Sequence, residues 1–262
     1  MRLTTLVFLF YTVFCAATEA SVLRLGTSTS TANSGLLNHL LPKFLNDTGI
    51  EVTYQAVGTG AALKLARDGK LDVLLVHAAV AEQKFMAQGY GIRREFVMFN
   101  DFVIVGPKPF AVDDLSQAMK VIISTPLTFV SRGDHSGTHK KEQMIWSEVN
   151  YDPIGEPWYM ETGSGMGSSL LVANKLQAYT IIDRGTWLAN KNKVSLRIAF
   201  EKSPLLMNEY SAIVVTSSFE LLNTKGANRF VDWLLSADIQ QHIANYKVNQ
   251  QSLFKPKTLY RR

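Results

Sequence analysis

The chain has 262 residues, carries a formal net charge of +5 and is 47% hydrophobic. This length suffices for one large domain or for two lobes with cores of their own. Cys15 is the only cysteine and falls in a segment expected to be removed, which excludes disulfides, thiolate catalysis and cysteine-bound metals from the mature protein. The basic excess is spread along the chain, which argues for small anions and against nucleic acid as the partner.

The N-terminus has the pattern of a secretory signal peptide. Arg2 is followed by an apolar run from Leu6 to Phe14 and then by small residues that end at Ala20. The run is too short to stay in a bilayer as a spanning helix. We therefore expect residues 1–20 to be removed during secretion. A lipoprotein anchor at Cys15 is the alternative, but such signals require a small residue where the bulky Phe14 stands.

Strands and helices alternate in the first part of the mature chain. Strands are predicted over residues 22–26, 50–57 and 72–77, and a helical pattern follows each of them. The first strand leads into five hydroxyl residues, Thr27 to Thr31, and the second leads into Gly58-Thr59-Gly60. Because open α/β sheets bind ligands beyond the carboxyl ends of their strands, both turns are candidate binding segments. A flexible Ser/Thr loop is the alternative interpretation of the first turn.

A second set of elements is predicted in the middle of the chain. Strands are expected over residues 100–106, 121–123, 129–130, 179–182 and 210–215, and helices over 140–149, 168–176 and 237–243 with Ser236 as a cap. The two sets indicate two lobes, joined by the strands 100–106 and 210–215. We predict that residues 21–103 and 212–262 form lobe one and that residues 104–211 form lobe two. The binding turns of both lobes would then face one cleft.

The stretch from Ser131 to Glu142 lies between a predicted strand and a predicted helix. Its small residues Ser136, Gly137 and Thr138 fall at the helix start, where backbone N–H groups lack partners and the helix dipole attracts anions. Arg132 adds a permanent cation with a fork of donors, and Asp134 is expected to orient it. The pattern predicts an oxyanion-binding turn. The alternative is an ordinary helix cap beside a surface ion pair.

His135, His139 and Asp134 raise the alternative of a metal site in a secreted phosphatase. A zinc-binding helix needs both histidines on one formed helical face together with a further ligand. Gly137 and the expected cap fall between these two histidines. We therefore expect no metal, no cofactor and no catalysis. Metal analysis and a phosphoester turnover assay would separate the two possibilities.

Residues 22–256 resemble the periplasmic tungstate-binding proteins of bacterial ABC importers, which have the type II periplasmic-binding fold. The resemblance rests on residues 27–31, 57–60, 72–78, 100–107, 131–142, 161–167, 183–186 and 248–249. The first motif of the family is usually Thr-Thr-Thr-Ser, where this chain has Thr27-Ser28-Thr29-Ser30, and the family usually has Asp where His135 stands. The Arg-x-Asp-x-Ser-Gly-Thr core is also similar to that of periplasmic phosphate-binding proteins.

The resemblance implies an α/β, two-lobed binding protein that holds a tetrahedral oxyanion between its lobes. The implied ligand-binding residues are Ser28, Thr29, Ser30, Thr59, Arg132, Ser136, Gly137, Thr138 and, as a further candidate, Arg184. The implied protein is a periplasmic monomer that delivers tungstate, or molybdate of the same charge and shape, to an ABC permease in the inner membrane. Phosphate and sulfate are the alternative ligands.

Overall fold

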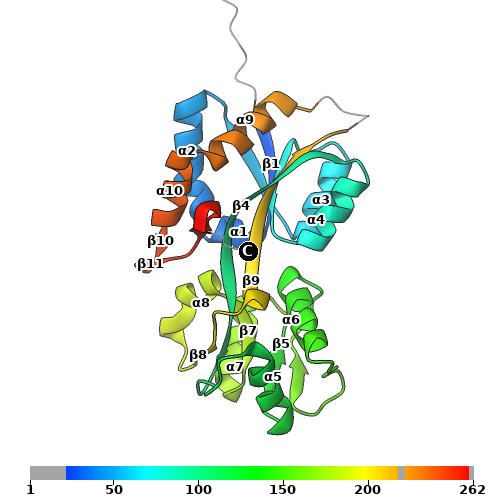
Figure 1. Ribbon diagram of the computed structural model, residues 1–262, viewed down its shortest axis with the longest axis vertical. Coiled ribbons are helices and arrows are strands. Elements are labelled where there is room, and N and C mark those ends of the chain that lie inside the picture. Colours follow the sequence, from blue (N-terminus) through cyan, green and yellow to red (C-terminus); the bar gives the residue numbers. More distant parts are fainter. Residues whose placement is uncertain (1–21, 218–221, 260–262) are drawn as a thin grey trace, which may run out of the picture.

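The computed structural model describes residues 22–217 and 222–259, which form two lobes connected by long strands (Figure 1). The expected signal peptide, residues 1–20, lies outside the described residues. Within the described ranges, no helix has both the length and the apolar character that a membrane crossing requires.

The first lobe is built on a sheet with the strand order β12–β4–β9–β3–β1–β2. β1, β2 and β3 run parallel to one another, whereas β9 is antiparallel to β3 and to β4. The elements of this lobe are β1 (Leu23–Thr27), α1 (Thr29–Asn33), α2 (Leu36–Thr48), β2 (Val52–Ala56), α3 (Thr59–Arg67), β3 (Val73–Val76), α4 (Ala79–Ala87), β9 (Met207–Val215), α9 (Thr224–Leu235), α10 (Ala237–Asn245), β10 (Lys247–Val248), β11 (Gln251–Ser252), β12 (Lys255–Pro256) and the 3-10 helix Lys257–Leu259.

The second lobe is assembled around the end of β4 (Gly91–Gly106), which pairs antiparallel with β7 and β8. β5 runs parallel to β6 and is bonded to the residue just before β7. The elements of this lobe are α5 (Leu115–Ser124), β5 (Phe129–Ser131), α6 (Gly137–Glu148), β6 (Tyr159–Glu161), α7 (Met166–Leu176), β7 (Thr180–Asp183), α8 (Arg184–Asn190), β8 (Arg197–Phe200) and the 3-10 helices Lys191–Lys193 and Pro204–Leu206.

Successive side chains of a strand point to opposite faces of the sheet, and in both lobes the two faces are buried. In the first lobe, Val73 and Leu75 of β3 pack with α2, α9 and α10, whereas Leu74 and Val76 pack on the opposite face with α3 and α4. In the second lobe, the even-numbered residues Phe102 and Ile104 of β4 face α5 and α6, and the odd-numbered residues 103 and 105 face α7 and α8. Each lobe is therefore a sheet covered by helices on both sides.

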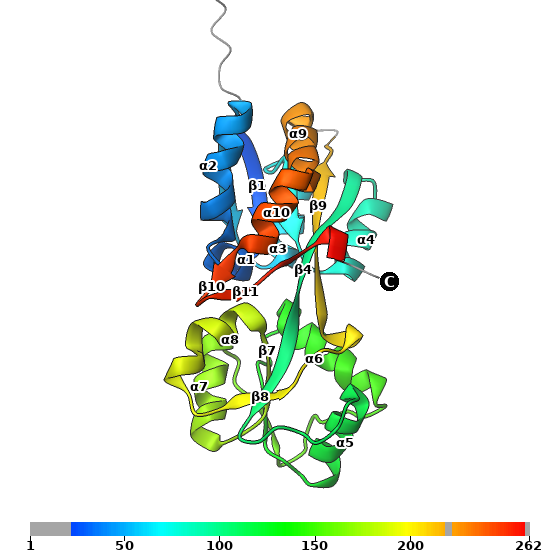
Figure 2. The same ribbon diagram turned by 60° about the vertical axis from the view of Figure 1, so that its left-hand side comes forward.

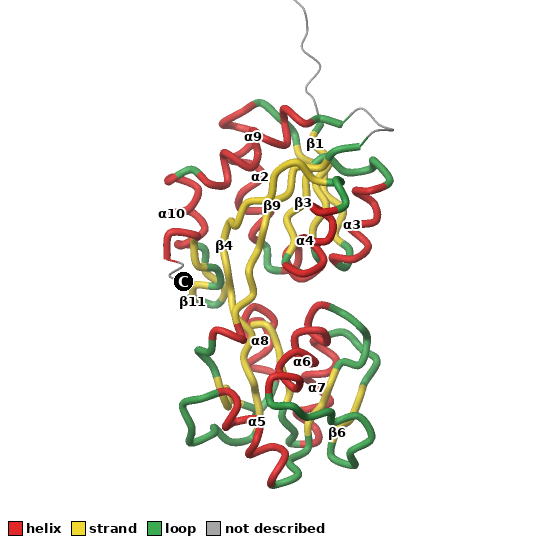
Figure 3. The backbone as a smooth tube through the Cα atoms, turned by 45° about the vertical axis from the view of Figure 1, so that its right-hand side comes forward, coloured by secondary structure: helices red, strands yellow, loops and turns green. Residues whose placement is uncertain are grey.

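β4 passes from one lobe to the other beside β9 (Figure 3). Residues 91–101 of β4 pair with β9, and the pairing changes at Phe102, where β7 takes over. The sequence predicted only residues 100–106 of this strand. The lobe limits predicted at residues 103 and 212 stay predictions.

The C-terminal hairpin of β10 and β11 adds a further contact between the lobes. Asn249 Nδ2 donates to Leu188 O of α8 at 2.7 Å, and Val248 packs against the apolar cluster of the second lobe. Figure 2 shows the hairpin beside α8. The hairpin therefore connects lobe one to the helix that follows β7.

The strand predicted at residues 121–123 is wrong, because this segment is the last part of helix α5. The run of Val and Ile is typical of a strand. The buried residues Leu115, Ala118, Met119 and Ile122 recur at helical spacing, and Asp114 caps the helix by accepting from Gln117 N. Amphipathic spacing and the cap therefore outweigh the β propensity of three residues.

Candidate functional site

Three residues of the first lobe follow neighbouring parallel strands at one edge of the sheet. Ser28 follows β1 directly, Thr59 follows β2 after two residues, and His77 follows β3 directly. β1 lies between the other two strands, and its last residue, Thr27, is in register with Ala56 of β2. The three side chains therefore belong to the carboxyl edge of the sheet, where open α/β sheets bind ligands.

The serine hydroxyls at this edge contact an imidazole. Ser28 Oγ lies 3.0 Å from His77 Nε2, and Ser30 Oγ lies 3.3 Å from the same nitrogen. The two hydroxyl oxygens are 3.0 Å apart. Ser28 is only 4% exposed, whereas Ser30 is half-buried and Thr29 is exposed. The structure therefore separates the three residues predicted in this turn by their access to solvent.

His77 also connects this turn to the two long strands. Its Nδ1 lies 3.0 Å from Asn208 Oδ1 on β9, and Asn208 Nδ2 donates to Asn100 Oδ1 on β4 at 2.7 Å. The hydrophobic pattern predicts a strand that ends at residue 77 but assigns this histidine no role. Because open α/β sheets bind ligands beyond the carboxyl ends of their strands, the position of His77 at the end of a predicted strand marks it as a candidate. No local signal marks Asn100 and Asn208, which lie 108 residues apart in the chain.

Arg132 stands at the corresponding edge of the second lobe, directly after β5. Its Nη2 donates to Asp134 Oδ2 at 2.5 Å, and its Nη1 donates to Thr138 Oγ1 at 3.3 Å. The expected pairing of Arg132 with Asp134 is therefore present. Arg132 Nε is buried and has no acceptor among the residues that the structure describes. Since an unpaired buried N–H is costly, this group is suited to a ligand.

Helix α6 begins with backbone N–H groups that its own hydrogen bonds leave unused. Ser136 caps the helix: its Oγ accepts from His139 N at 3.3 Å, and its N–H donates to Asp134 Oδ1 at 3.2 Å. Gly137 and Thr138 belong to the first turn, whose N–H groups have no intrahelical acceptor, and the helix dipole favours an anion here. Ser136 is thus engaged as a cap, and its contact with a ligand stays a prediction.

Gly137 brings the two sets of residues together. A Cβ built on Gly137 would lie 3.9 Å from His77 Cε1, so the start of α6 reaches the imidazole that contacts Ser28 and Ser30. In Figure 1, α1 lies on the side of the upper lobe that faces α6 and α8 of the lower lobe. The hydroxyl groups of one lobe and the N–H and guanidinium donors of the other therefore converge.

The structure gives Arg184 partners within the protein. Its Nε donates to Asp101 Oδ1 at 2.6 Å, and its Nη2 donates to Asp101 Oδ2 at 2.5 Å and to Glu201 Oε2 at 2.6 Å. The hydrogen bonds with Asp101 raise the pKa of Arg184 further above its usual value. These bonds fix α8 to β4, and the ligand contact of Arg184 stays a prediction. Thr59 is half-buried at the start of α3, and its ligand contact stays a prediction.

The histidines of the predicted turn contact each other rather than a common centre. His135 N donates to His139 Nδ1 at 3.0 Å, and the two ring centroids are 5.6 Å apart. Burial lowers the pKa of His139, whose Nε2 lies 3.8 Å from Glu161 Oε1. In the part of the chain that the structure describes, no group of three or more His, Cys, Asp or Glu side chains has the arrangement of a metal site.

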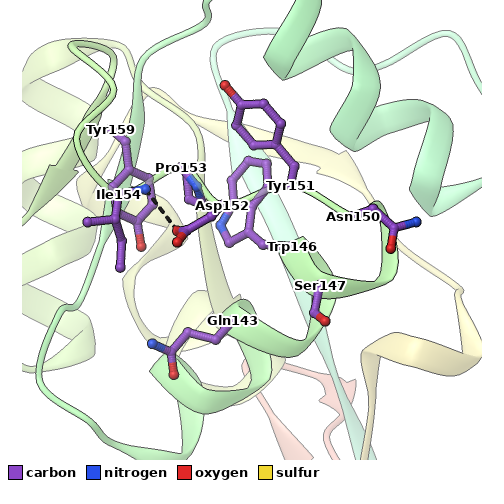
Figure 4. A pocket seen from close by; sticks show the side chains of 9 residues that line it. All are labelled: Gln143, Trp146, Ser147, Asn150, Tyr151, Asp152, Pro153, Ile154 and Tyr159. Carbon is purple, nitrogen blue, oxygen red and sulfur yellow. Dashed lines mark hydrogen bonds between the residues drawn. The ribbon is translucent and has the colours of Figure 1, made fainter.

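A pocket of about 450 Å³ lies elsewhere in the second lobe (Figure 4). Its lining includes the rings of Trp146, Tyr151 and Tyr159, and the carboxylate of Asp152 accepts from Ile154 N at 3.1 Å. None of the nine residues that line it is basic. This pocket offers aromatic surface and a carboxylate, so it is not suited to an oxyanion.

Known proteins provide an independent comparison. A family model described as a PBP superfamily domain matches residues 16–238. The chain belongs to the PBP superfamily. The tungstate-binding protein TupA of Peptoclostridium acidaminophilum is 47% identical over 230 residues, which cover 85% of this chain and 80% of the relative.

Two solved structures extend this similarity to the whole fold. The tungstate-binding protein TupA from Desulfovibrio alaskensis G20 is 40% identical with a TM-score of 0.85, and the match covers 91% of this chain and 99% of that one. A structure described as the tungstate ABC transporter from Geobacter sulfurreducens is 41% identical with a TM-score of 0.76, covering 86% and 98% of the two chains. The two-lobed α/β binding fold predicted from the sequence is confirmed.

Proposed function

We propose that this protein is the extracytoplasmic component of an ABC importer that captures tungstate and delivers it to a permease. The observation that carries the proposal is the approach of Gly137 to His77, which brings the donors around Arg132 to the hydroxyls of Ser28 and Ser30. Relatives that are named tungstate-binding proteins and match most of this chain support the choice of anion.

The donor set is suited to a tetrahedral dianion. Arg132 supplies positive charge and an unpartnered Nε–H, and the start of α6 supplies the N–H groups of Gly137 and Thr138. The Thr138 hydroxyl accepts from Arg132, so its own hydrogen is available to the ligand. Every oxygen of an unprotonated oxyanion is an acceptor, so each of these donors can bond to it.

The number of donors is consistent with tight binding. Hydrogen bonds to charged groups contribute roughly 1.5–3 kcal/mol each. About five to seven such bonds would reach the roughly −12 kcal/mol of a nanomolar complex, and the costs of ordering and lobe closure must be subtracted. Arg132, Gly137 and Thr138 provide four of these donors in the second lobe, and the hydroxyl turn and α3 provide the rest.

In this proposal the protein acts in the periplasm as a monomer and performs no chemistry on its ligand. Closure of the lobes around the anion presents the loaded shape to the permease in the inner membrane. Molybdate has the same charge and shape, so it is expected to compete for the same donors. Phosphate is the second candidate ligand, because the Arg-x-Asp-x-Ser-Gly-Thr segment beginning at Arg132 is also similar to phosphate-binding proteins.

Titration calorimetry of the mature chain with tungstate, molybdate, sulfate and phosphate tests the proposal. We expect tungstate and molybdate to bind far more tightly than the other two. Tungstate should also raise the melting temperature and reduce the scattering radius, because a ligand held between lobes stabilises the closed form. Tighter binding of phosphate would assign the protein to the phosphate-binding class, and binding of none of the four would contradict the proposal.

A further inference from the structure

The amide orientation of Asn208 sets the direction of the hydrogen bonds around His77. Asn208 Nδ2 donates to Asn100 Oδ1 at 2.7 Å and to Tyr210 Oη at 3.2 Å, which uses both amide hydrogens. Asn208 Oδ1, 3.0 Å from His77 Nδ1, is then the acceptor of that contact, and His77 Nδ1 carries the hydrogen. In a neutral imidazole with this hydrogen, Nε2 can only accept.

The surroundings of His77 favour the neutral ring. Burial lowers the pKa of His77, whereas the bond to Asn208 and the charge of Asp183 act to raise it and the charge of Lys141 acts to lower it. The ring also lies 4.8 Å from that of Tyr210, whose own pKa is raised by burial, so this neighbour is uncharged near neutral pH. His77 Nε2 is therefore an acceptor under the conditions in which the protein works.

Ser28 has no hydrogen to offer a ligand. Its Oγ accepts from Thr31 N at 3.1 Å and lies 2.6 Å from Thr31 Oγ1. The Tyr210 hydroxyl accepts from Asn208 at 3.2 Å and from Asn100 Nδ2 at 3.4 Å, so its own hydrogen is directed to its remaining partner Thr31, which then donates to Ser28. With both lone pairs of Ser28 used, its single hydrogen is directed to His77 Nε2 at 3.0 Å.

Ser30 differs from Ser28 in its hydrogen bonding and in its exposure to solvent. Its Oγ lies 3.3 Å from His77 Nε2, but that nitrogen has one lone pair, which the nearer Ser28 occupies. Ser30 is half-buried, whereas Ser28 is 4% exposed. Ser28 Oγ is 3.0 Å from Ser30 Oγ, but its lone pairs are used by Thr31, so the hydroxyl hydrogen of Ser30 can turn to a ligand.

We propose that His77, held as its Nδ1–H tautomer by Asn208, takes the hydroxyl hydrogen of Ser28 and thereby leaves Ser30 as the serine of this turn that donates to the oxyanion. His77 is a positioning residue in this scheme, since it contacts the hydroxyls and not the anion. The inference rests on the proposed function and refines it, because Ser28 becomes a support for the site rather than one of its donors.

The tautomer can be read directly by nuclear magnetic resonance. Mature protein labelled at histidine with the heavy nitrogen isotope is studied with and without tungstate, and the His77 signals are identified by their absence from the His77→Gln variant. We expect a hydrogen on Nδ1 and none on Nε2 in both states, with no titration between about pH 6.5 and 8. An Nε2–H tautomer or an imidazolium in either state would overturn the proposal.

A pair of serine variants tests the consequence for binding. Ser30→Ala should raise the Kd for tungstate about tenfold or more, with little change in the melting temperature of the free protein. Ser28→Ala should lower that melting temperature, because it removes the cap of α1 and the partner of His77, and should raise the Kd by less than Ser30→Ala does. A larger increase in Kd for Ser28→Ala would overturn the assignment.

Failure of this inference and failure of the proposed function give different results. Wild-type protein that binds no tungstate would contradict the proposed function and leave Ser30 without a ligand to donate to, whatever the tautomer is. Wild-type protein that binds tungstate with His77 protonated at Nε2 would contradict only the assignment of the hydroxyls. Ser28→Thr, which keeps the hydroxyl, should restore the stability and affinity that Ser28→Ala loses.

Discussion

Asp134 holds the guanidinium of Arg132, whose Nη2 lies 2.5 Å from Asp134 Oδ2. The two side chains are 15% and 21% exposed, so the pair is largely shielded from solvent. Partial burial acts to raise the pKa of Asp134, but hydrogen bonds from Ser136 and the charge of Arg132 bring it below its usual value. The carboxylate therefore stays ionised and fixes the plane of the guanidinium, which in turn sets the direction of the unpartnered Nε–H.

Replacing Arg132 with lysine should weaken the binding of tungstate at least tenfold. The three N–H groups of a lysine share one nitrogen, so they cannot reach Asp134, Thr138 and the ligand at the separate positions of Nη2, Nη1 and Nε of Arg132. A tenfold change corresponds to about 1.4 kcal/mol, roughly one charge-assisted hydrogen bond. Titration calorimetry measures the Kd, and circular dichroism checks that the fold is intact.

Arg93→Lys provides a matched control. Arg93 also pairs with a carboxylate, that of Asp232 at 2.8 Å, but on the surface of the first lobe and away from the candidate site. Its replacement should leave the Kd for tungstate within about twofold of wild type, since exposed ion pairs contribute little. The same small effect for Arg132→Lys would remove the basis for placing Arg132 at the ligand.

The contrast between Arg132 and Arg184 shows which features could be predicted from sequence. The partner of Arg132 is two residues away, so the local pattern was sufficient to predict the pair. Arg184 stands in a similar pattern, but the local sequence does not reveal its partner Asp101, which is 83 residues away on β4. Sequence patterns report local caps and ion pairs, whereas contacts between distant strands depend on the completed sheet.

The same limit applies to the first lobe. The order of strands and helices there was predictable from hydrophobic spacing and turn residues, and so were the turns at the carboxyl ends of the strands. The partner of Ser28 was not, because His77 is 49 residues away and reaches the turn only when β3 pairs with β1. The hydroxyl run alone therefore does not distinguish Ser28, Thr29 and Ser30. In the fold they differ in burial and in hydrogen bonding.

Gly133→Ala should destabilise the fold by about 1–3 kcal/mol. Gly133 has a φ of +61°, in the left-handed region that side chains rarely adopt, and a Cβ there would lie 2.7 Å from the Cβ of Glu161. Unfolding in urea measures the change. Gly167→Ala in α7 is the control, because a Cβ at that position meets no heavy atom within 4 Å outside its own stretch of helix. The control should be neutral or up to about 1 kcal/mol more stable, and an equal loss in both variants would contradict the account of Gly133.

Glu142 should make the stability of the protein depend on pH. This side chain is 1% exposed and accepts from Tyr159 Oη at 2.7 Å and from Trp146 Nε1 at 3.2 Å. Burial raises the pKa of Glu142 from 4.5 to about 7. Between these two values the folded protein keeps a proton that the unfolded chain has released. The stabilising contribution is therefore full below about pH 4.5, decreases as the pH rises to about 7 and is absent above that.

Glu142→Gln removes this ionisation and keeps a side chain of similar size. At about pH 8 the variant should have a higher free energy of unfolding than wild type, by on the order of 1–3 kcal/mol, because wild type then carries a buried charge. At about pH 5 the difference should shrink, because both side chains are neutral. Urea unfolding at both pH values tests this, and a difference that stays constant would show that Glu142 does not titrate in this range.

The two acidic side chains nearest the proposed donors in the sequence, Asp134 and Asp183, are both directed at protein donors. Asp134 accepts from Arg132 and from Ser136 N, and Asp183 accepts from Thr186 N at 2.9 Å and from Thr186 Oγ1 at 2.6 Å. Phosphate carries a proton near neutral pH, so a site that prefers it benefits from a free acceptor. Tungstate carries no proton there. The arrangement therefore favours an anion that only accepts hydrogen bonds.

We accordingly expect tungstate to remain bound in the presence of about a thousandfold excess of phosphate, which corresponds to about 4 kcal/mol of discrimination. The affinity should be nearly constant between about pH 6.5 and 8, since Asp134 is ionised and burial keeps His77 neutral in that range. Sulfate is also unprotonated but has shorter bonds, so it should not reach donors spaced for a larger oxyanion. The measurement is competition against loaded protein at both pH values. Displacement by phosphate would indicate an acceptor at the site, and displacement by sulfate would indicate donors spaced for a smaller oxyanion.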